Sequence, residues 1–248
     1  YRLAHWRVAA DEINYRRFFD INDLAGVRSE LPEVFEDVHR ELFRLIHRGC
    51  VHGLRIDHPD GLRDPGMYFE ELQARAGASH AGARPLFVVV EKILAKDEHM
   101  PDEWPVHGET GYQFANVVNG LFVDSAAAER FSRIYSEFTG EHASYDSMLF
   151  SAKKLVLSEM LSSEFAQLAG LLQLVAQSSP ATRDFTLNIL RSALASVIAA
   201  FPVYRTYIVA GHVSDQDRRY VKQAVKRACE ASRQIDPSVF EFMHDVLL

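Results

Sequence analysis

The sequence predicts an α/β fold in its first half and a mostly helical second half. Helix-like and strand-like segments alternate between residues 33 and 91, no hairpin turn joins the strand-like segments, and β-branched runs nearly vanish after Ser125. This order of elements implies right-handed crossovers and a parallel sheet covered on both faces. We therefore expect residues 1–124 and 125–248 to form two different structural parts.

The first helix and strand are predicted between residues 33 and 57. Apolar residues recur from Glu33 to Gly49 at the spacing of one helical face, with Pro32 in the opening turn. A short apolar segment follows and leads into the turn-forming residues 58–61. We expect this segment to be a strand that ends at Asp57.

A second helix and a second strand follow in the same order. Residues Pro65–Ala76 show a helical pattern, and the uninterrupted apolar run of residues 86–90 comes after a loop rich in glycine, alanine and proline. Such a run is typical of a strand buried on both faces of a parallel sheet. This strand is expected to end at Glu91.

The second half is expected to be a series of helices. Ser125 suits the N-cap of the first, and Leu155–Ala176 has the pattern of one long apolar helix. Another helix follows Pro180, and a further one begins at Ser214, with Asp217 three positions later as in a capping box. The apolar stripe of the first of these helices consists of Phe131, Ile134, Tyr135 and Phe138.

Composition narrows the class of protein. The 248 residues are 48% hydrophobic and 25% charged, which is enough to bury a core, and the net charge of −7 leaves no basic stripe for nucleic acid or an anionic membrane. Cys50 and Cys229 predict free thiols in a reducing cytoplasm. Neither a signal peptide nor a membrane-spanning run is visible. Because the chain begins with Tyr1, we expect it to be an internal fragment of a longer protein.

Asp57 and Glu91 are the candidate catalytic pair, because each ends a predicted parallel strand. The carboxyl ends of such strands form the substrate-binding face of α/β folds and barrels. Two carboxylates there could lie about 5 to 5.5 Å apart, as the nucleophile and acid/base of a retaining glycosidase do. Arg55 points to the same side as Asp57 and would keep it ionised. Apolar surroundings would favour the protonated form of Glu91. The alternative is that Arg55 and Asp57 form a purely structural ion pair.

Two segments resemble signatures of the alpha-amylase superfamily (glycoside hydrolase family 13). GLRIDH at residues 53–58 resembles the fourth-strand segment that carries the nucleophile, and VVVEKIL at 88–94 resembles the fifth-strand segment with the acid/base. Within the superfamily, the chain is similar to the maltooligosyl trehalose synthase family in the order and spacing of several segments. These are residues 9–26, RIDHPDGL, VVVEKIL, DEWPVHGETGYQFANVVNGLFVD and FPVYRTYI.

The resemblance implies that residues 1–124 hold strands 4 and 5 of a (β/α)8 TIM barrel and that residues 125–248 are a mostly helical insertion. It implies an isomerase that needs no cofactor and moves the terminal glucose of a maltooligosaccharide from an α-1,4 to an α,α-1,1 trehalose linkage. Asp57 would be the nucleophile and Glu91 the general acid/base. A functional partnership with a trehalose-releasing hydrolase is also implied.

Further residues are candidates for binding the sugar. His58 follows the nucleophile, and Lys92 follows the acid/base; their alternatives are a structural histidine and a surface lysine. Aromatic side chains could stack on sugar rings, with core packing as the alternative for each. These aromatic candidates are Tyr15, Phe18, Phe19, Trp104, Tyr112 and Phe114. No metal site is expected, because His99 and His107 lack ligand spacing.

The family pattern is incomplete in this chain. A third carboxylate, expected in a His-Asp segment on the seventh strand, is not visible, because His244-Asp245 lies in an amphipathic helical pattern. An amylomaltase (4-alpha-glucanotransferase) or a hydrolytic amylase of the same superfamily remains an alternative. So does a glucan-binding fragment without turnover, and chain-length preference and oligomeric state stay open.

Overall fold

The computed structural model describes residues 3, 5–10, 12, 13, 15–77 and 85–248. The chain divides into two compact units. The helical unit comprises Tyr1–Gly26, Glu141–Pro202 and Ile208–Leu248, and the sheet unit comprises Val27–Gly140 and Val203–Tyr207. These bounds differ from the expected division after residue 124, since the N-terminal segment joins the helical unit and a short segment far along the chain joins the sheet unit.

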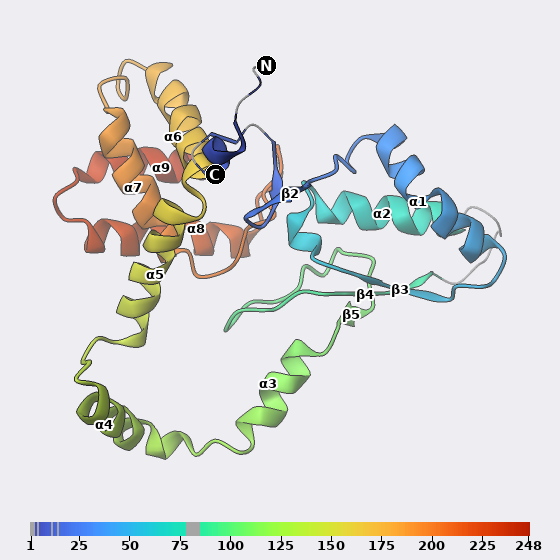
Figure 1. Cartoon of the computed structure of the whole chain (residues 1–248), viewed down its shortest axis with the longest axis horizontal. Coiled ribbons are helices and arrows are strands. Elements are labelled where there is room, and N and C mark those ends of the chain that lie inside the picture. Colours follow the sequence, from blue (N-terminus) through green and yellow to red (C-terminus); the bar gives the residue numbers. More distant parts are fainter. Residues whose placement is uncertain (1–2, 4, 11, 14, 78–84) are drawn as a thin grey trace. The chain divides into compact units, whose positions relative to one another are not determined.

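The sheet unit contains a three-stranded parallel sheet (Figure 1). Its strands are β3 (Gly53–Ile56), β4 (Phe87–Val90) and β5 (Gly108–Glu109), in the order β3-β4-β5. Ile56 pairs with Val90 in the parallel ladder. The two predicted strands and their parallel pairing are confirmed, whereas the short β5 was not predicted.

Two helices cover one face of this sheet. Figure 1 shows α1 (Pro32–His47) and α2 (Pro65–Gly77) beside each other over the strands. Both predicted helices are confirmed, and they share one core with the sheet. The buried members of that core are Phe35, Phe43, Phe69, Leu72, Val88, Val90 and Trp104.

The expectation of a fully buried β4 is wrong for its other face. Phe87 is 52% exposed and Val89 is only half-buried, while Val88 and Val90 are buried. The strand therefore alternates as a one-sided strand does, because within the described chain helices cover one side of it. Most of the loop predicted before this strand, residues 78–84, lies outside the described residues.

Two further helices extend from the sheet unit as α3 (Tyr112–Gly120) and α4 (Ala128–Thr139), joined by the turn η3 (Ser125–Ala127). Within the described chain they bury none of their residues. The apolar stripe of α4 is therefore exposed. Ser125 is not the N-cap here, because the Asp124 carboxylate accepts the Ala126 N–H at 3.0 Å.

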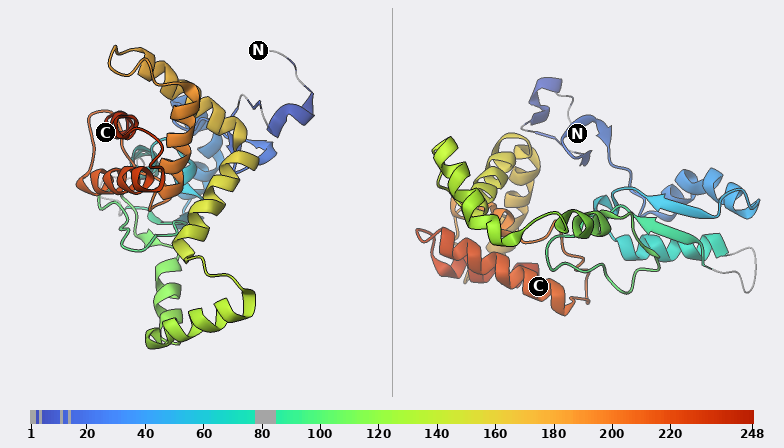
Figure 2. Two further views of the ribbon diagram at one scale, coloured as in Figure 1. Left: turned by 90° about the vertical axis from the view of Figure 1, so that its left-hand side faces the viewer. Right: turned by 90° about the horizontal axis from the view of Figure 1, so that it is seen from below.

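The helical unit is built around one central helix. It contains η1 (Trp6–Ala10), β1 (Arg17–Phe18), β2 (Ile21–Ala25), α5 (Tyr145–Glu159), α6 (Ser162–Gln177), α7 (Leu187–Ala200), α8 (Asp215–Ala231) and α9 (Pro237–Leu247). Of these, α7 packs against α5, α6, α8 and α9 (Figure 2). Its buried small residues, among them Ala193 and Ser196, let neighbouring helices approach closely. Ser214 caps α8 as predicted, accepting the Asp217 N–H at 3.0 Å.

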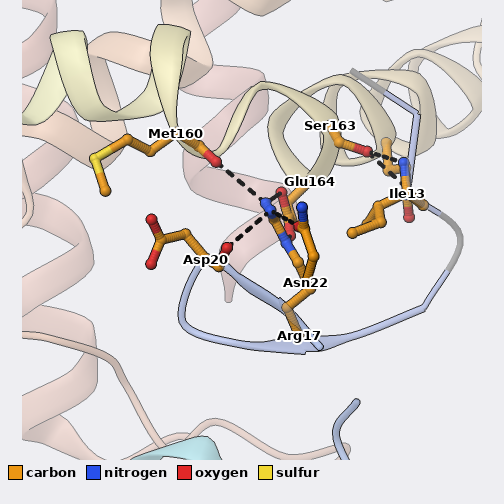
Figure 3. Close-up of polar contacts among 8 residues, drawn as sticks. Ile13, Arg17, Asp20, Asn22, Met160, Ser163 and Glu164 are labelled. Carbon is orange, nitrogen blue, oxygen red and sulfur yellow. Dashed lines mark hydrogen bonds and ion pairs between the residues drawn. The ribbon is translucent and has the colours of Figure 1, made fainter. Parts of the chain in front are cut away.

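The long helix expected over Leu155–Ala176 is two helices bent by 91°. The corner between α5 and α6 is held by Arg17, whose guanidinium donates to the Met160 carbonyl at 3.1 Å and to both carboxylate oxygens of Glu164 at 2.8 Å (Figure 3). The single-helix prediction was wrong because the residue that stabilises the break lies more than a hundred positions away. Among the described residues no single helix is long and apolar enough to cross a membrane. Only the bent pair of α5 and α6, taken together, has the required length and apolar composition.

Candidate active site

Asp57 and Glu91 lie at equivalent positions on neighbouring strands. Each follows directly after a strand, and the last residues of these strands, Ile56 and Val90, pair in register. The backbone N–H of Glu91 donates to the Ile56 carbonyl at 2.8 Å, which extends the ladder by one step. The parallel register therefore brings both carboxylates to one edge of the sheet, as the sequence predicts.

Arg55 connects the two carboxylates. Its Nη1 lies 2.6 Å from Oδ1 of Asp57, and its Nη2 lies 3.3 Å from Oε1 of Glu91. The hydrogen bond from Arg55 is the largest cause that lowers the pKa of Asp57 below its ordinary value of 3.8, and Glu91 lowers it further. Asp57 is thus held as an open, ionised carboxylate with 63% of its side chain exposed.

Glu91 has a more polar environment than expected from its sequence neighbours. Besides Arg55, the backbone N–H of His58 donates to Oε2 at 3.2 Å, and the hydroxyl of Tyr112 donates to Oε1 at 3.2 Å. The expectation of an apolar setting for Glu91 is therefore wrong, because the turn at His58 and the first residue of α3 supply hydrogen-bond donors to this carboxylate. Glu91 remains accessible, with a quarter of its side chain exposed.

Tyr112 is placed by a carboxylate that sequence reasoning missed. Glu109 ends β5, and its Oε2 accepts the N–H groups of Gly111 at 2.7 Å and Tyr112 at 2.6 Å, which caps the start of α3. Gly111 has a φ of 112°, a conformation that favours glycine. The hydrogen bond to Glu91 is the main cause that raises the pKa of Tyr112 above its ordinary value. A Glu three residues before the first helical residue was the only local sign of this cap.

Two of the predicted sugar-binding residues are buried. The side chain of Lys92 is completely inaccessible, and its ammonium lies 2.8 Å from Oε1 of Glu98 and 3.2 Å from Oδ2 of Asp60. Neither a sugar contact nor the alternative of a surface lysine fits this position. Trp104 is 5% exposed and packs between Phe69 and a tyrosine ring, which makes it a core residue.

The other candidates are divided between the two units. His58 turns through the left-handed region, with φ 43° and ψ 54°, and its ring lies edge-on to Tyr204 at 5.9 Å. Phe114 lies on α3 and is 72% exposed. The N-terminal aromatic candidates belong to the helical unit. They are Tyr15, Phe18 and Phe19.

The parallel sheet therefore carries two carboxylates bridged by one arginine at the edge where α/β folds bind their substrates. No protein-family model matches the chain. A protein of Mycobacterium tuberculosis that carries the provisional name maltooligosyl trehalose synthase is 36% identical over 168 residues. That alignment covers 68% of this chain and 21% of the relative.

Solved structures show the same relationship. The maltooligosyltrehalose synthase of Arthrobacter ramosus matches with a TM-score of 0.81 and 33% identity over 99% of this chain and 29% of its own. A glycosyltrehalose synthase from DSM5389 matches with a TM-score of 0.68 and 32% identity, over 92% of this chain and 28% of its own. The chain is thus a homologue of the maltooligosyl trehalose synthases. It spans about a fifth of the length of the curated relatives it matches.

Proposed function

We propose that this chain supplies the nucleophile and the acid/base of an enzyme that converts the reducing-end α-1,4 linkage of a maltooligosaccharide into an α,α-1,1 linkage. The observation that supports this most directly is the Arg55 bridge between Asp57 and Glu91. We also propose that β3, β4 and β5 form part of a (β/α)8 barrel of the alpha-amylase type, which would place this edge at the bottom of a substrate cleft.

The first half-reaction uses the two carboxylates in different protonation states. Ionised Asp57 attacks the anomeric carbon of the penultimate glucose while protonated Glu91 gives its proton to the bridging oxygen. The C–O bond breaks, a glycosyl ester forms on Asp57, and the terminal glucose stays in the site with its reducing end intact. Arg55 favours this step because it stabilises the ionised nucleophile.

The second half-reaction returns both groups to their starting states. Glu91, now a carboxylate, takes the proton of the anomeric hydroxyl of the retained glucose, and that oxygen attacks the glycosyl ester. The ester bond breaks, Asp57 is released as a carboxylate, and the product carries an α,α-1,1 linkage. Atoms and charges balance without a cofactor. Water must stay out of the site, because its attack would release glucose instead.

The experiment that tests this proposal traps the intermediate. Maltosyl fluoride in the α configuration needs no acid to lose its fluoride, so Glu91→Gln should still be glycosylated on Asp57 while the slow second step lets the adduct accumulate. Mass spectrometry of the peptide that contains Asp57 detects the adduct. Asp57→Asn, which removes the nucleophile and nearly preserves its shape, is the matched control and should carry none.

The type of reaction is tested separately with maltopentaose. We expect reducing ends to disappear in a chimera in which this chain replaces the matching segment of the Arthrobacter ramosus enzyme, and Asp57→Asn to abolish that loss. An adduct with conserved or growing numbers of reducing ends would point to a glucanotransferase or a hydrolase. An unlabelled Asp57 together with glucan binding that Asp57→Asn leaves unchanged would point to a binding fragment and overturn the proposal.

A further inference from the structure

A buried polar network lies directly behind the loop that follows the nucleophile. The ammonium of Lys92 is inaccessible and ion-pairs with Asp60 and Glu98. The remaining carboxylate oxygen of Asp60, Oδ1, accepts a hydrogen bond from the hydroxyl of Tyr207. Asp60 is itself 9% exposed, so its charge is satisfied by partners inside the protein instead of by water.

The same loop is held through its backbone by Arg205. One nitrogen, Nη1, donates to the carbonyls of Asp60 at 3.0 Å and Leu62 at 2.6 Å, and Nη2 donates to the carbonyl of Arg63 at 3.3 Å. The guanidinium also lies 5.0 Å from the centre of the Tyr207 ring. A planar group with several fixed donors is suited to holding several carbonyls at once.

The loop needs such support, because its first residue is strained. His58 has a φ of 43°, which is uncommon for a residue with a side chain, and this turn aims its N–H at Glu91. The turn is also tight: a Cβ atom at Gly61 would lie 2.7 Å from Cδ2 of His58. Strained conformations persist where the surrounding structure determines them, and here residues 203–207 supply that structure.

We propose that Arg205 and Tyr207 are positioning residues for the candidate active site. Acting through Asp60 and the loop carbonyls, they hold the His58 turn so that its N–H donates to the proton-transferring carboxylate of Glu91. This inference rests on the proposed function for its catalytic meaning. Its structural content, the coupling of the 203–207 segment to the His58–Glu91 hydrogen bond, can be measured without turnover.

The measurement is an NMR titration of the whole chain. The backbone ¹⁵N–H signal of His58 reports the ionisation of Glu91, because this N–H donates to the carboxylate. Glu91→Gln identifies the contribution of this carboxyl, since it should remove that pH-dependent change from the His58 signal. We expect Tyr207→Phe, which deletes one hydroxyl, to displace the His58 signal and to shrink or shift its titration.

Two further variants make the test decisive. Arg205→Lys keeps the charge and the Tyr207 hydroxyl but cannot hold three carbonyls, so it should give a similar change and carries the test if Tyr207→Phe does not fold. Tyr220→Phe in α8 is the matched control, because it deletes a phenol hydroxyl from the helical unit, and it should leave the His58 signal unchanged. A His58 signal and titration in Tyr207→Phe and Arg205→Lys identical to those of the unmodified chain would overturn the inference.

Turnover kinetics give the second readout. A slight displacement of a catalytic group can reduce a rate by up to about a hundredfold. We expect Tyr207→Phe to slow turnover of maltopentaose in the chimera through kcat, with KM nearly unchanged and the pH profile displaced. Loss of thermal stability alone, with the kcat pH profile preserved, would reduce both residues to a structural role. Absence of turnover in every variant would count against the proposed function, whereas the NMR result would still decide this inference.

Discussion

Replacing Arg17 should release the N-terminal hairpin of β1 and β2 from the corner between α5 and α6. The Arg17 side chain is 3% exposed, and its guanidinium makes a two-point ion pair with Glu164. The guanidinium also donates to the Asp20 carbonyl, the Asn22 side-chain oxygen and the Met160 carbonyl (Figure 3). Arg17→Met removes all of these donors while it keeps most of the apolar stem. The change therefore tests the polar contacts more than the packing.

The expected loss can be worked out from exposure. Removing one partner of a fully buried ion pair costs about 3 to 5 kcal/mol. Glu164 is 32% exposed, so water can solvate its carboxylate once Arg17 is gone, and the loss of the ion pair should cost only about 2 kcal/mol. The carbonyls left without a donor add about 1 kcal/mol to this cost. We expect a total of about 3 kcal/mol, equivalent to roughly a hundredfold in the equilibrium for opening the hairpin.

The assay is native-state hydrogen exchange at the amides of Ile13 and Gly26. The first donates to the Ser163 hydroxyl at 2.6 Å, and the second donates to the Arg16 carbonyl at 2.7 Å. Both should exchange faster in Arg17→Met. The exposed Arg44, which pairs with Glu41 on the surface of α1, provides the matched control: Arg44→Met should change stability by less than about 0.5 kcal/mol.

The stability that the Arg17–Glu164 ion pair contributes should decrease as the pH falls. Burial by itself raises the pKa of Glu164, but the hydrogen bonds and charge of Arg17 outweigh it and leave that pKa below 4.5. A carboxyl with a lowered folded-state pKa contributes stability that is present above its ordinary value and lost as the pH falls through the lowered one. The difference in stability between the unmodified chain and Arg17→Met should therefore become smaller as the pH falls. Unchanged protection of Ile13 and Gly26 at neutral pH would refute this account of the corner.

Two further predictions concern the site and the core. Arg55→Met should raise the pKa of Asp57 toward its ordinary value, because it removes the largest cause that lowers this pKa. As the pH is lowered, the rate of adduct formation should then decline at a higher pH than in the unmodified chain. An unchanged decline in acid would show that Arg55 does not control the ionisation of Asp57. Leu190→Ala should destabilise the helical unit by about 3 to 4 kcal/mol, because this completely buried side chain lies in its core. A urea titration measures that loss, and a change below about 1 kcal/mol would mean that the core collapses into the space.

The candidate catalytic pair could be read from the sequence because the signal is local. Asp57 and Glu91 each follow a short apolar run, and a run of that kind predicts a strand whatever surrounds it. Parallel strands place their carboxyl ends at one edge, so two local patterns were enough to bring the carboxylates together. Arg55 followed from the alternation of side chains along a strand.

The misplaced residues share one cause. Lys92 was chosen because it adjoins Glu91 and Trp104 because it is aromatic, but burial is decided by what packs against a position from elsewhere in the chain. The 91° corner before α6 is another example, because its supporting Arg17 lies in the N-terminal hairpin. Tyr112 was predicted as a sugar-stacking residue, and only the fold shows that its hydroxyl reaches Glu91.

The sequence by itself determined the helices α1, α2, α7, α8 and α9, the two main strands, and the identity of the paired carboxylates with their arginine. It could do so because periodicity, caps and strand ends are properties of a few neighbouring residues. Only the tertiary structure decided which protein groups donate hydrogen bonds to the carboxylate of Glu91 and which residues hold the loop after Asp57. Those features depend on ion pairs and hydrogen bonds between segments far apart along the chain, such as residues 60 and 207, and their partners are chosen by packing and not by spacing.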